Sequence, residues 1–589
     1  MGPVVGSFWT VDTKTLEFRA FGAGRKVIAE GFYKYYYAPK RMTWVTNDLL
    51  AVDYGAVAEL MNLDGDEVMN LGTAFLGKAA PDNPDSTTLI YSKGTKSKTF
   101  HYANYKSKTT ARIRFSAPGR PINWVFDKSG ELRAATMLDS DLWKDATKIV
   151  NWYRESGTSE WMKLAEFSLS DRFWTPEAID EPSQTLIVTS NIGRDTMALF
   201  SYDPKTRKIG EMLAGHPTED VTQGSGLRLG KFNSVVTAGM KPKTVWLEPD
   251  WSHAQKSVDA VLPNKVNLIY GDPKKLILVL SYSDIDPGTW YLLDMQSKNM
   301  RRFALVEPSL ENAKARPMEV TSYAGKDGLY IPAYLAKPEK SDVPLPLVVL
   351  IHGGPADRDR WYWDPDVQVL TEAGFAVLQP QFRGSSGFGV KFMEAGFGQW
   401  GLAMQDDITA GVEAMIARGI ADPKRICIVG ASYGGYAAMW GLVKTPELYR
   451  CGVSFAGVSD LDFMFKDDSD SNDDKVSREL MRLQIGDPSK KQSFDSVSPL
   501  KNADRIVAPI LLMHGSKDER VPISHSKRMI AALQSSKKTF EWHEFEGASH
   551  GLSESEHRSV FYEKLVGFLK KHIPPDQPAA AKVRSETKE

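Results

Sequence analysis

The chain has no surplus of either charge and no long apolar run. It carries 73 Lys and Arg against 74 Asp and Glu among 589 residues, so its overall field attracts neither nucleic acid nor an anionic membrane. Its longest apolar stretches, such as residues 345–351, have the length of a strand, far short of the roughly 20 residues of a membrane-spanning helix. We therefore expect no nucleic-acid partner and no membrane span. The length exceeds one compact core and predicts at least two domains.

Cysteine is almost absent. Cys427 and Cys451 are the only two, too few for a disulfide scaffold and without the spacing of a zinc site. Two buried thiols are the favoured interpretation. Both residues lie near the starts of strands that we expect to be neighbours, so a single disulfide is the alternative, and it would imply an exported protein. Because no signal-peptide pattern is present, we expect a soluble protein, cytoplasmic, or periplasmic or secreted if a leader was removed.

Signals for a cofactor or a metal are also missing. The sequence holds no P-loop, no dinucleotide fingerprint after a strand and no HExxH motif, so we expect neither a cofactor nor a metal. The acidic run at residues 467–474 lacks the Gly and the closing Glu of an EF-hand loop. A solvated loop is the favoured interpretation of this run.

The first half of the chain consists of short aromatic and β-branched runs between Asp, Gly, Asn and Lys turns, which predicts an all-β region. A hairpin with an Asp-led turn recurs. It is clear in FWTVDTKTLEFRAF, LFSYDPKTRKIGEML and WYLLDMQSKNMRRF, and weaker at residues 59–71, 100–113 and 161–169. Repeats at roughly 40-residue spacing predict a β-propeller of six or seven blades over residues 1–310, with the first blade incomplete or closed by borrowed strands.

The second half alternates strands with amphipathic helices. Helices are expected at residues 402–418 and 554–572, and strands at 347–351, 376–379, 426–429, 453–456, 510–513 and 539–545. This alternation predicts an α/β-hydrolase-type domain over residues 311–573, a mostly parallel sheet with helices on both faces. Residues 574–589 have no pattern that can bury a face and are expected to form a flexible tail.

A nucleophile is predicted at Ser432. The segment GASYGGY follows the strand RICIV and precedes the helical run AAMWGLV, which is the setting of a G-x-S-x-G nucleophile elbow. The tight turn holds the serine in a strained conformation and leaves no room for side chains beside it, hence the glycines.

The general base and its orienting acid should follow the serine along the chain, in the order acid and then histidine. Asp518 lies in the loop after the strand PILLMHG, and His550 lies in the loop after the strand TFEWHEF. Loops beyond the carboxyl ends of such strands hold the active sites of these sheets. Glu519 is the alternative to Asp518. His543 is the alternative to His550, but it lies within its strand.

Two backbone N–H groups are needed to stabilise the tetrahedral oxyanion. One should come from Tyr433, the residue after the nucleophile. The other should come from the loop His352-Gly353-Gly354-Pro355, which is similar to the HGGG-type loop of esterases. The amide of Gly354 is the favoured donor, and a plain Gly-Gly-Pro turn is the alternative.

Together these segments resemble the prolyl oligopeptidase family and, within it, the acylaminoacyl peptidase-like branch. The matching stretches are LIHGGP, QFRGSSGFG, GQWGLAMQDD, GASYGGY, HGSKDERVP and ASHG. The resemblance implies that a propeller caps the hydrolase, so that only peptides or other small substrates reach an interior site. It also implies that Arg520, two residues after Asp518, holds a substrate carbonyl. The dipeptidyl-peptidase branch has Asn there and a Glu pair in its propeller; neither is identified here, which argues against that activity.

We therefore predict a serine peptidase that cleaves short peptides through an acyl-enzyme on Ser432, of oligopeptidase, acylaminoacyl-peptidase or aminopeptidase type. A carboxylesterase with the same three residues is the first alternative, since ester cleavage needs only these residues and the oxyanion donors. A propeller-based binding protein that keeps an inactive hydrolase domain is the second. The expected partners are short peptides or small esters, and a homo-oligomer is compatible with the sequence.

Overall fold

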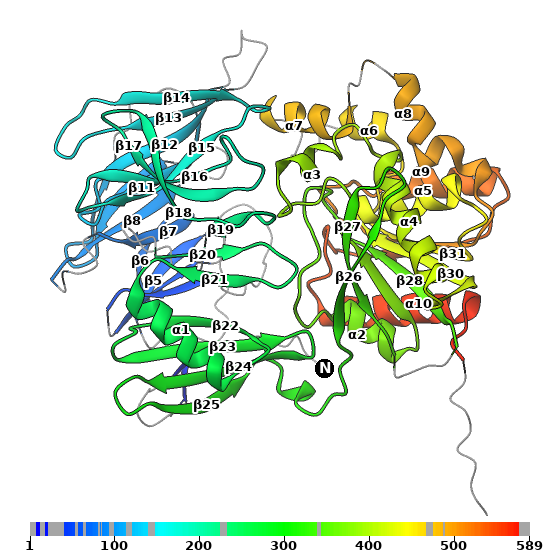
Figure 1. The fold of residues 1–589 in the computed structure, drawn as a ribbon, viewed down its shortest axis with the longest axis horizontal. Coiled ribbons are helices and arrows are strands. Elements are labelled where there is room, and N and C mark those ends of the chain that lie inside the picture. The colour runs from blue at the N-terminus through cyan, green and yellow to red at the C-terminus, as the bar shows by residue number, and fades with distance from the viewer. Residues whose placement is uncertain are drawn as a thin grey trace, which may run out of the picture.

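The fold is taken from a computed structural model. It describes residues 8–11, 18–21, 41–46, 48–53, 57–62, 66–79, 83, 85–93, 99–113, 120–139, 148–223, 233–338, 343–466, 475–486, 489 and 491–576. The strands of a propeller and a helix-covered sheet lie side by side (Figure 1). No helix in these ranges has the length and apolar character needed to cross a bilayer. The acidic run at residues 467–474 and the expected tail from residue 577 onward lie outside the described residues.

The N-terminal region is a six-bladed β-propeller, as predicted for its fold class. Its first three blades are β3 to β6 (Arg41–Trp44, Leu49–Asp53, Ala58–Asn62, Glu67–Asn70), β7 to β10 (Ala74–Lys78, Thr88–Lys93, Thr99–Asn104, Thr109–Arg112) and β11 to β14 (Arg120–Phe126, Leu132–Asp139, Lys148–Tyr153, Met162–Ser168). The next three are β15 to β18 (Trp174–Asp180, Thr185–Ser190, Ala198–Asp203, Lys208–Ala214), β19 to β21 (Val221–Gln223, Ser234–Thr237, Lys243–Trp246) and β22 to β25 (Val266–Gly271, Leu276–Ser283, Asp286–Asp294, Asn299–Leu305). A separate antiparallel pair, β1 and β2 (Phe8–Val11, Phe18–Phe21), precedes them.

The strands of the three clear Asp-led hairpins pair as the sequence predicts, and the two turns at Asp203 and Asp294 explain the pattern. Asp203 accepts the backbone N–H of Lys205 at 2.8 Å, and Arg207 then takes a positive φ of 58° before β18 begins. Asp294 accepts the N–H of Gln296 at 2.8 Å in the same manner before β25. A short carboxylate that binds the backbone two residues ahead stabilises this kind of turn. The weaker copy at residues 161–169 is instead the single strand β14, the last of its blade.

The expectation that this half is all-β misses one helix. Helix α1 (Pro249–Val261) packs beside β21 and β22 and buries Trp251, Ala254, Gln255 and Val258. These positions have the i, i+3, i+4, i+7 spacing of one helix face. The signal was therefore in the sequence, but the strand-rich segments around it dominated the prediction.

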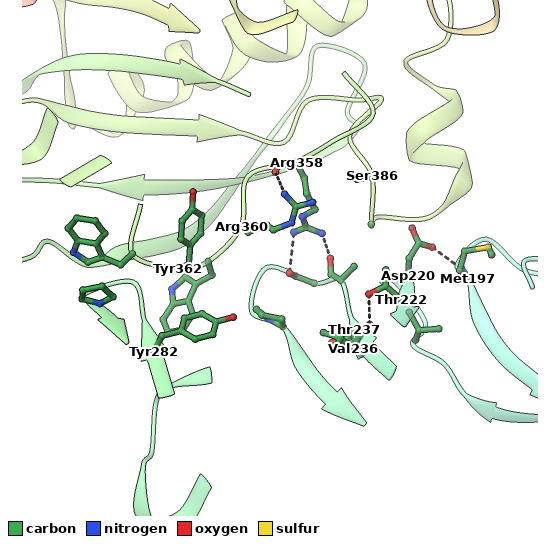
Figure 2. Close-up of a pocket in the computed structure, with 18 of the residues that line it drawn as sticks. Met197, Asp220, Thr222, Val236, Thr237, Tyr282, Arg358, Arg360, Tyr362 and Ser386 are labelled. Carbon is green, nitrogen blue, oxygen red and sulfur yellow. Dashed lines mark hydrogen bonds between the residues drawn. The ribbon is translucent and has the colours of Figure 1, made fainter. Parts of the chain in front are cut away.

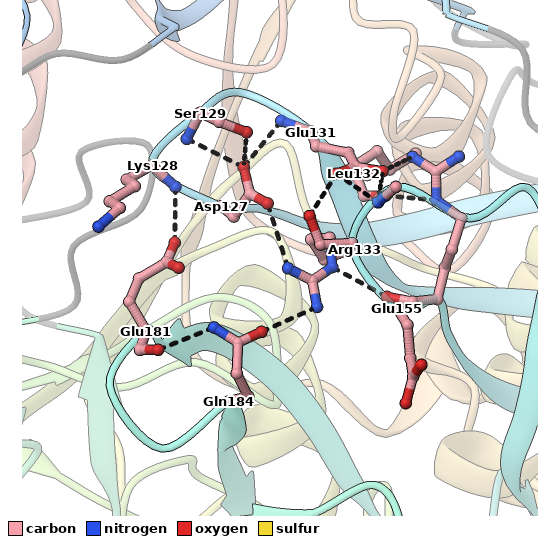
Figure 3. Close-up of polar contacts among 12 residues, drawn as sticks. Asp127, Lys128, Ser129, Glu131, Leu132, Arg133, Glu155, Glu181 and Gln184 are labelled. Atoms are coloured by element: carbon pink, nitrogen blue, oxygen red, sulfur yellow. Dashed lines mark hydrogen bonds and ion pairs between the residues drawn. The ribbon is translucent and has the colours of Figure 1, made fainter.

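A buried ionic cluster joins neighbouring blades around Arg133 (Figure 3). The guanidinium of Arg133 is 2% exposed and donates to Asp127 Oδ2 at 3.2 Å, within its own blade. It also donates to Tyr153 OH at 3.1 Å and to Gln184 Oε1 of the next blade at 3.2 Å. Because each nitrogen of the guanidinium has an acceptor, with Nε donating to Arg154 O, the charge is tolerated inside the propeller.

The C-terminal region is built on an eight-stranded sheet with the order β26-β27-β29-β28-β30-β31-β32-β33. Its strands are Met318–Ala324, Tyr330–Ala336, Ala376–Pro380, Leu345–Ile351, Ala421–Ala431, Cys451–Phe455, Ile510–Gly515 and Phe540–Phe545, in that spatial order. All neighbours from β29 onward are parallel, while β27 is antiparallel to both β26 and β29. The parallel part was predicted. The antiparallel pair β26 and β27 was not identified in the sequence.

Helices cover both faces of this sheet, as expected for an α/β-hydrolase fold. On one face α2 (Pro365–Glu372) and α10 (Ser555–His572) pack against strand residues such as Val348. On the other face the strands contribute Leu347 and Val349, and the main covering helices are α4 (Ala403–Ala417), α5 (Tyr433–Lys444) and α9 (Ser524–Ser535). The remaining helices are α3 (Val390–Glu394), α6 (Leu461–Lys466), α7 (Lys475–Ile485) and α8 (Lys491–Val497), with short 3₁₀ turns η1 (Pro308–Leu310) and η2 (Pro499–Arg505). The domain boundaries at residues 310 and 573 stay a prediction.

The two cysteines are register partners in the parallel neighbours β30 and β31, with Cα atoms 4.8 Å apart, and they are joined as a disulfide. The favoured interpretation of two buried thiols is therefore wrong, and the alternative of a single disulfide holds. The two interpretations were inseparable in the sequence because both place the residues on neighbouring strands.

The propeller holds the segment that follows β29. Asp195 accepts the N–H of Lys391 on its side chain at 2.8 Å and the N–H of Val390 on its carbonyl at 2.9 Å, both in the first turn of α3. Arg172 forms a two-pronged ion pair with Glu394 at the end of that helix, the second contact at 3.0 Å. These bonds fix a loop of the hydrolase region against the propeller.

Candidate active site

Ser432 lies at the turn between β30 and α5 in a strained conformation, with φ 58° and ψ −118°. A positive φ is costly for a residue with a side chain. Its backbone N–H donates to Phe455 O at 2.9 Å, which ties the turn to β31. A β-carbon at Gly430 or Gly434 would collide with backbone atoms, of Gly434 and of Ile351 respectively. The two flanking glycines are therefore required by the tightness of this turn.

Asp518 and His550 meet although they come from different loops. Asp518 follows β32 and His550 follows β33, and His550 Nδ1 lies 2.7 Å from Asp518 Oδ2. The other carboxylate oxygen of Asp518 accepts the backbone N–H groups of Arg520 and Val521, each at 2.9 Å. The carboxylate is thus held rigidly while it faces the imidazole.

A second histidine, His514, also binds this carboxylate. Its Nε2 lies 3.2 Å from Asp518 Oδ2 and 2.7 Å from Val521 O, and its Nδ1 lies 2.7 Å from Ser526 Oγ. Burial alone would raise the pKa of Asp518, but the hydrogen bonds from His514, His550 and Val521 outweigh it and lower the pKa below its usual range. Asp518 is therefore ionised at neutral pH. His514 was not predicted from the sequence, although its place at the end of β32 was a usable signal.

The HGGP loop lies against the candidate nucleophile. A β-carbon added at Gly353 would lie 3.5 Å from Ser432 Cβ and 3.5 Å from Ala431 O. Gly354 has a φ of 121°, a conformation open only to glycine, and a β-carbon there would meet the N–H groups of Ala356 and Asp357. The N–H of Tyr433 belongs to the first turn of α5, where N–H groups have no helical acceptor. Gly353 of the HGGP loop and Tyr433 at the start of α5 therefore both lie next to Ser432.

Arg520 is exposed, and among the described residues its guanidinium forms no ion pair, with Glu519 or with any other carboxylate. Glu519 is exposed and makes no bond to His550, and His543 lies half-buried in β33 with its ring against Phe545. The roles assigned to the site residues stay a prediction.

A cavity of about 820 Å³ opens between the hydrolase region and the propeller (Figure 2). Its hydrolase wall includes Arg358, Arg360 and Tyr362, which follow the HGGP loop, together with Ser386 and Gly387. Its propeller wall includes Thr222, Thr237 and Tyr282. Arg358 is buried and donates to Gly239 O of the propeller at 3.1 Å, so it serves the interface. A cavity of this size suits a small ligand.

In the part of the chain that the structure describes, no three His, Cys, Asp or Glu side chains gather to hold a metal.

The chain is similar to known peptidases. A family model described as "Prolyl oligopeptidase family" matches residues 361–575. Dipeptidyl aminopeptidase BIII of Pseudoxanthomonas mexicana is 29% identical over 435 residues, which cover 71% of this chain and 62% of that protein. The acylamino-acid-releasing enzyme of Rattus norvegicus is 27% identical over 238 residues, 40% of this chain and 32% of that protein. The chain thus spans less than two thirds of either curated relative.

A solved structure, that of a Mycobacterium tuberculosis puromycin-hydrolyzing peptidase, superposes with a TM-score of 0.71 at 18% identity. The match covers 92% of this chain and 88% of that one. At this identity the likeness shows the fold, a propeller followed by an α/β-hydrolase domain.

Proposed function

Residues 361–575 of this chain are a prolyl oligopeptidase family domain, and from this premise we propose that the protein is a serine peptidase that cleaves short peptides. The observation that carries the proposal is the 2.7 Å bond between His550 Nδ1 and Asp518 Oδ2, together with the strained turn that holds Ser432. A carboxylate that fixes the imidazole in this manner leaves Nε2 free to accept the proton of a serine hydroxyl.

The reaction then proceeds in two halves. Ser432 Oγ attacks the peptide carbonyl carbon while His550 Nε2 takes the hydroxyl proton, and the N–H groups of Tyr433 and Gly354 bind the resulting oxyanion. His550 returns the proton to the leaving amine, which leaves an acyl ester on Ser432. A water molecule, deprotonated by His550, attacks this ester and releases the acid, and the proton passes back to Ser432.

Arg520 is proposed to hold a carbonyl of the peptide, because its guanidinium is exposed and uncommitted to a described carboxylate. The cavity between the two regions is proposed to receive part of the peptide, since the residues of its hydrolase wall from Arg358 to Trp363 follow the HGGP loop in the chain. Access through such a cavity favours short chains, so a native protein of about 150 residues should be spared.

The test compares four substrates that share the same acyl group. A peptide p-nitroanilide with a free amine, its N-acetyl form, the matching p-nitrophenyl ester and a short internal peptide are assayed on the wild-type chain and on Ser432→Ala. We expect hydrolysis of peptide bonds that Ser432→Ala abolishes, and labelling of the wild-type chain alone by a fluorophosphonate. Cleavage of an anilide at an equal rate by folded Ser432→Ala would refute the proposal. The ratio of acetylated to free-amine turnover separates acylaminoacyl-peptidase from aminopeptidase behaviour.

A carboxylesterase is the second candidate, because nothing in the three side chains distinguishes an ester from an amide carbonyl. Ester hydrolysis without detectable anilide hydrolysis in the same assay would favour it.

We also propose an oxidising compartment, supported by the Cys427–Cys451 disulfide. Alkylation of the denatured native protein without reductant should then modify neither cysteine.

A further inference from the structure

The carboxylate of Asp518 has a donor that the mechanism above does not use. Its Oδ1 accepts the backbone N–H groups of Arg520 and Val521, each at 2.9 Å. Its Oδ2 lies 2.7 Å from His550 Nδ1 and also 3.2 Å from His514 Nε2. Two imidazoles therefore meet at one carboxylate oxygen, and only that of His550 takes part in the reaction.

The proton positions on His514 follow from its partners. Its Nε2 lies 2.7 Å from Val521 O, and a carbonyl oxygen can only accept a hydrogen bond, so Nε2 carries a proton. The side chain is 0% exposed, and a second proton would bury a cation at high cost. Nδ1 is therefore the acceptor of the neutral ring, and the Ser526 hydroxyl of α9 donates to it at 2.7 Å. The Nε2–H group is left to serve both Val521 O and the Asp518 carboxylate.

Other bonds keep the carboxylate in place without His514. The two backbone N–H groups on Oδ1 belong to the loop of Asp518 itself. The N–H of Asp518 donates to Gly515 O at 3.3 Å, and the N–H of Lys517 donates to Ala548 O, in the loop after β33, at 2.9 Å. The main contribution of His514 to Asp518 is therefore the partial positive charge of its Nε2–H at Oδ2.

Further charged and titratable side chains lie on the elements around this pair. They are Lys517, Glu519 and Arg520 in the loop after β32, Glu544 and Glu546 in and after β33, Asp460 after β31, Lys501 in η2, and His525, Lys527 and Arg528 in α9. Several form ion pairs: Lys527 with Glu544 at 3.4 Å, and Asp460 with Arg528 at 3.1 Å and with Lys501 at 3.8 Å. Burial lowers the pKa of His525 to about 3, so this neighbour is neutral near pH 7. The variants below leave all these groups unchanged, so a change in pH dependence reports on His514.

We propose that His514 tunes the general base: its Nε2–H takes up part of the negative charge on Asp518, weakens the hold of that carboxylate on the His550 proton, and so keeps His550 able to accept a proton down to lower pH. The physical reason is that a carboxylate stabilises a protonated neighbour less when another donor shares its charge. His514 acts through Asp518 and is therefore a positioning residue. The role rests on the proposed function.

Variants of the full chain separate this role from a packing role. In His514→Gln the amide nitrogen occupies the place of Nε2 and can still donate to Val521 O and Asp518. In His514→Asn the amide reaches only the place of Nδ1, so the contact with Ser526 is kept and the donor at Oδ2 is lost. Ser526→Ala removes a bond on the other side of the ring and keeps the Nε2–H. His543→Gln, a change of a half-buried histidine in the neighbouring strand β33, is the matched control.

A fifth variant covers the case in which His514→Asn does not fold. His514→Phe keeps a ring of similar size and also lacks a donor at Oδ2. It then takes the place of His514→Asn, with the same expected result.

The readout is the acidic limb of kcat/KM against pH, measured with a peptide p-nitroanilide from about pH 5 to 9. Since His550 must be unprotonated to act as base, a tighter hold on its proton moves this limb to higher pH. We expect His514→Asn to move the limb up by about 0.5 to 1 pH unit, with the plateau of kcat/KM within about fivefold of wild type. His514→Gln, Ser526→Ala and the control should keep the limb within about 0.2 pH unit. Ser526→Ala should still lower the melting temperature, because a buried nitrogen loses its donor.

Alkylation of the general base gives a second readout that does not depend on turnover. A peptidyl chloromethyl ketone reacts with the unprotonated Nε2 of His550, which forms an N–C bond and releases chloride. The rate of inactivation should therefore show the same acidic limb in each variant, shifted upward in His514→Asn alone. Peptide mass spectrometry checks that His550 is the modified residue.

The proposal is overturned if the limb of His514→Asn stays within about 0.2 pH unit of wild type or moves to lower pH. A downward shift would show that His514 only holds the loop, because His550 would then have lost its carboxylate. It is also overturned if His514→Gln or Ser526→Ala shifts the limb as much as His514→Asn, which would indicate a deformed loop. A wild-type chain that a fluorophosphonate does not label would instead refute the proposed function, and this role with it.

Discussion

Replacing Asp518 by Asn changes the candidate site by one group without changing its shape. Asp518 is 7% exposed and uses one oxygen for two backbone N–H groups at 2.9 Å. An Asn keeps these two bonds only if its oxygen takes that place, which turns its NH₂ group toward His550 Nδ1. His550 must then accept at Nδ1 and carry its proton on Nε2. In that tautomer it cannot take the proton of Ser432.

The size of the expected loss in kcat follows from the same contacts. The charged hydrogen bond that the imidazolium gains from Asp518, about 1.5 to 3 kcal/mol, disappears in the transition state. Turning the imidazole against the new donor costs about 1 to 3 kcal/mol more. The sum of about 2.5 to 6 kcal/mol corresponds to a loss of about 10²- to 10⁴-fold in kcat. The fold should survive, because His514 Nε2 still has Val521 O at 2.7 Å as an acceptor.

The assay measures kcat at pH 7.5 with a peptide p-nitroanilide, beside the melting temperature of each variant. Glu519→Gln is the matched control, since it removes a neighbouring exposed carboxylate that makes no bond to His550. The reasoning fails if folded Asp518→Asn keeps kcat within tenfold of wild type, or if Glu519→Gln loses as much.

Three further predictions use other parts of the molecule. Arg520→Ala should lower kcat/KM for peptides by about 10- to 150-fold, which corresponds to the loss of one charge-assisted hydrogen bond. Hydrolysis of the p-nitrophenyl ester should stay within a few-fold of the wild-type rate. Equal losses on both substrates would contradict a role of Arg520 in peptide binding. Arg133→Met leaves the buried Asp127 carboxylate without its ion-pair partner, and Tyr153 and Gln184 without a buried donor. The propeller should therefore lose about 3 kcal/mol of unfolding free energy in urea, against at most about 1 kcal/mol for the exposed Lys163→Met. Similar losses in the two variants would show that the cluster around Arg133 does not stabilise the propeller. Burial lowers the pKa of His525 to about 3. Between about pH 3 and 6.5 the unfolded chain therefore binds more protons than the folded chain. The free energy of unfolding should decrease as the pH is lowered through that window, by up to about 1.4 kcal/mol per pH unit. The melting temperature of His525→Gln should depend less on pH between 5 and 7.5, and an unchanged slope would show that His525 is not buried neutral.

The features that the sequence predicted are those encoded by residues close together in the chain. The elbow at Ser432 needs only a strand, two glycines and a helix within one short segment. Asp518 and His550 could be assigned because parallel strands bring their carboxyl ends to one edge of the sheet, so loops far apart in sequence become neighbours.

The features that the sequence did not predict depend on partners chosen by the tertiary structure. The strands β26 and β27 have no helical crossover between them, so the alternation of strands and helices gave no sign of them. His514 and His352 are ordinary strand-end residues until the fold supplies Asp518 and Ser385 as partners. The state of Cys427 and Cys451 depended on a register of two strands that composition does not contain.

The bonds from Asp195 to the first turn of α3 have a consequence for how such proteins diverge. If the propeller were replaced by that of a relative, its loops would differ from those of this chain. The N–H groups of Lys391 and Val390 would then lose their acceptors unless the new loops also placed a carboxylate and a carbonyl oxygen beside them. That segment follows Ser385, which contacts His352 at 3.0 Å, so the loss would also affect the HGGP loop. Blades that meet α3 are therefore expected to evolve together with the hydrolase, while the blades remote from it are free to vary in sequence.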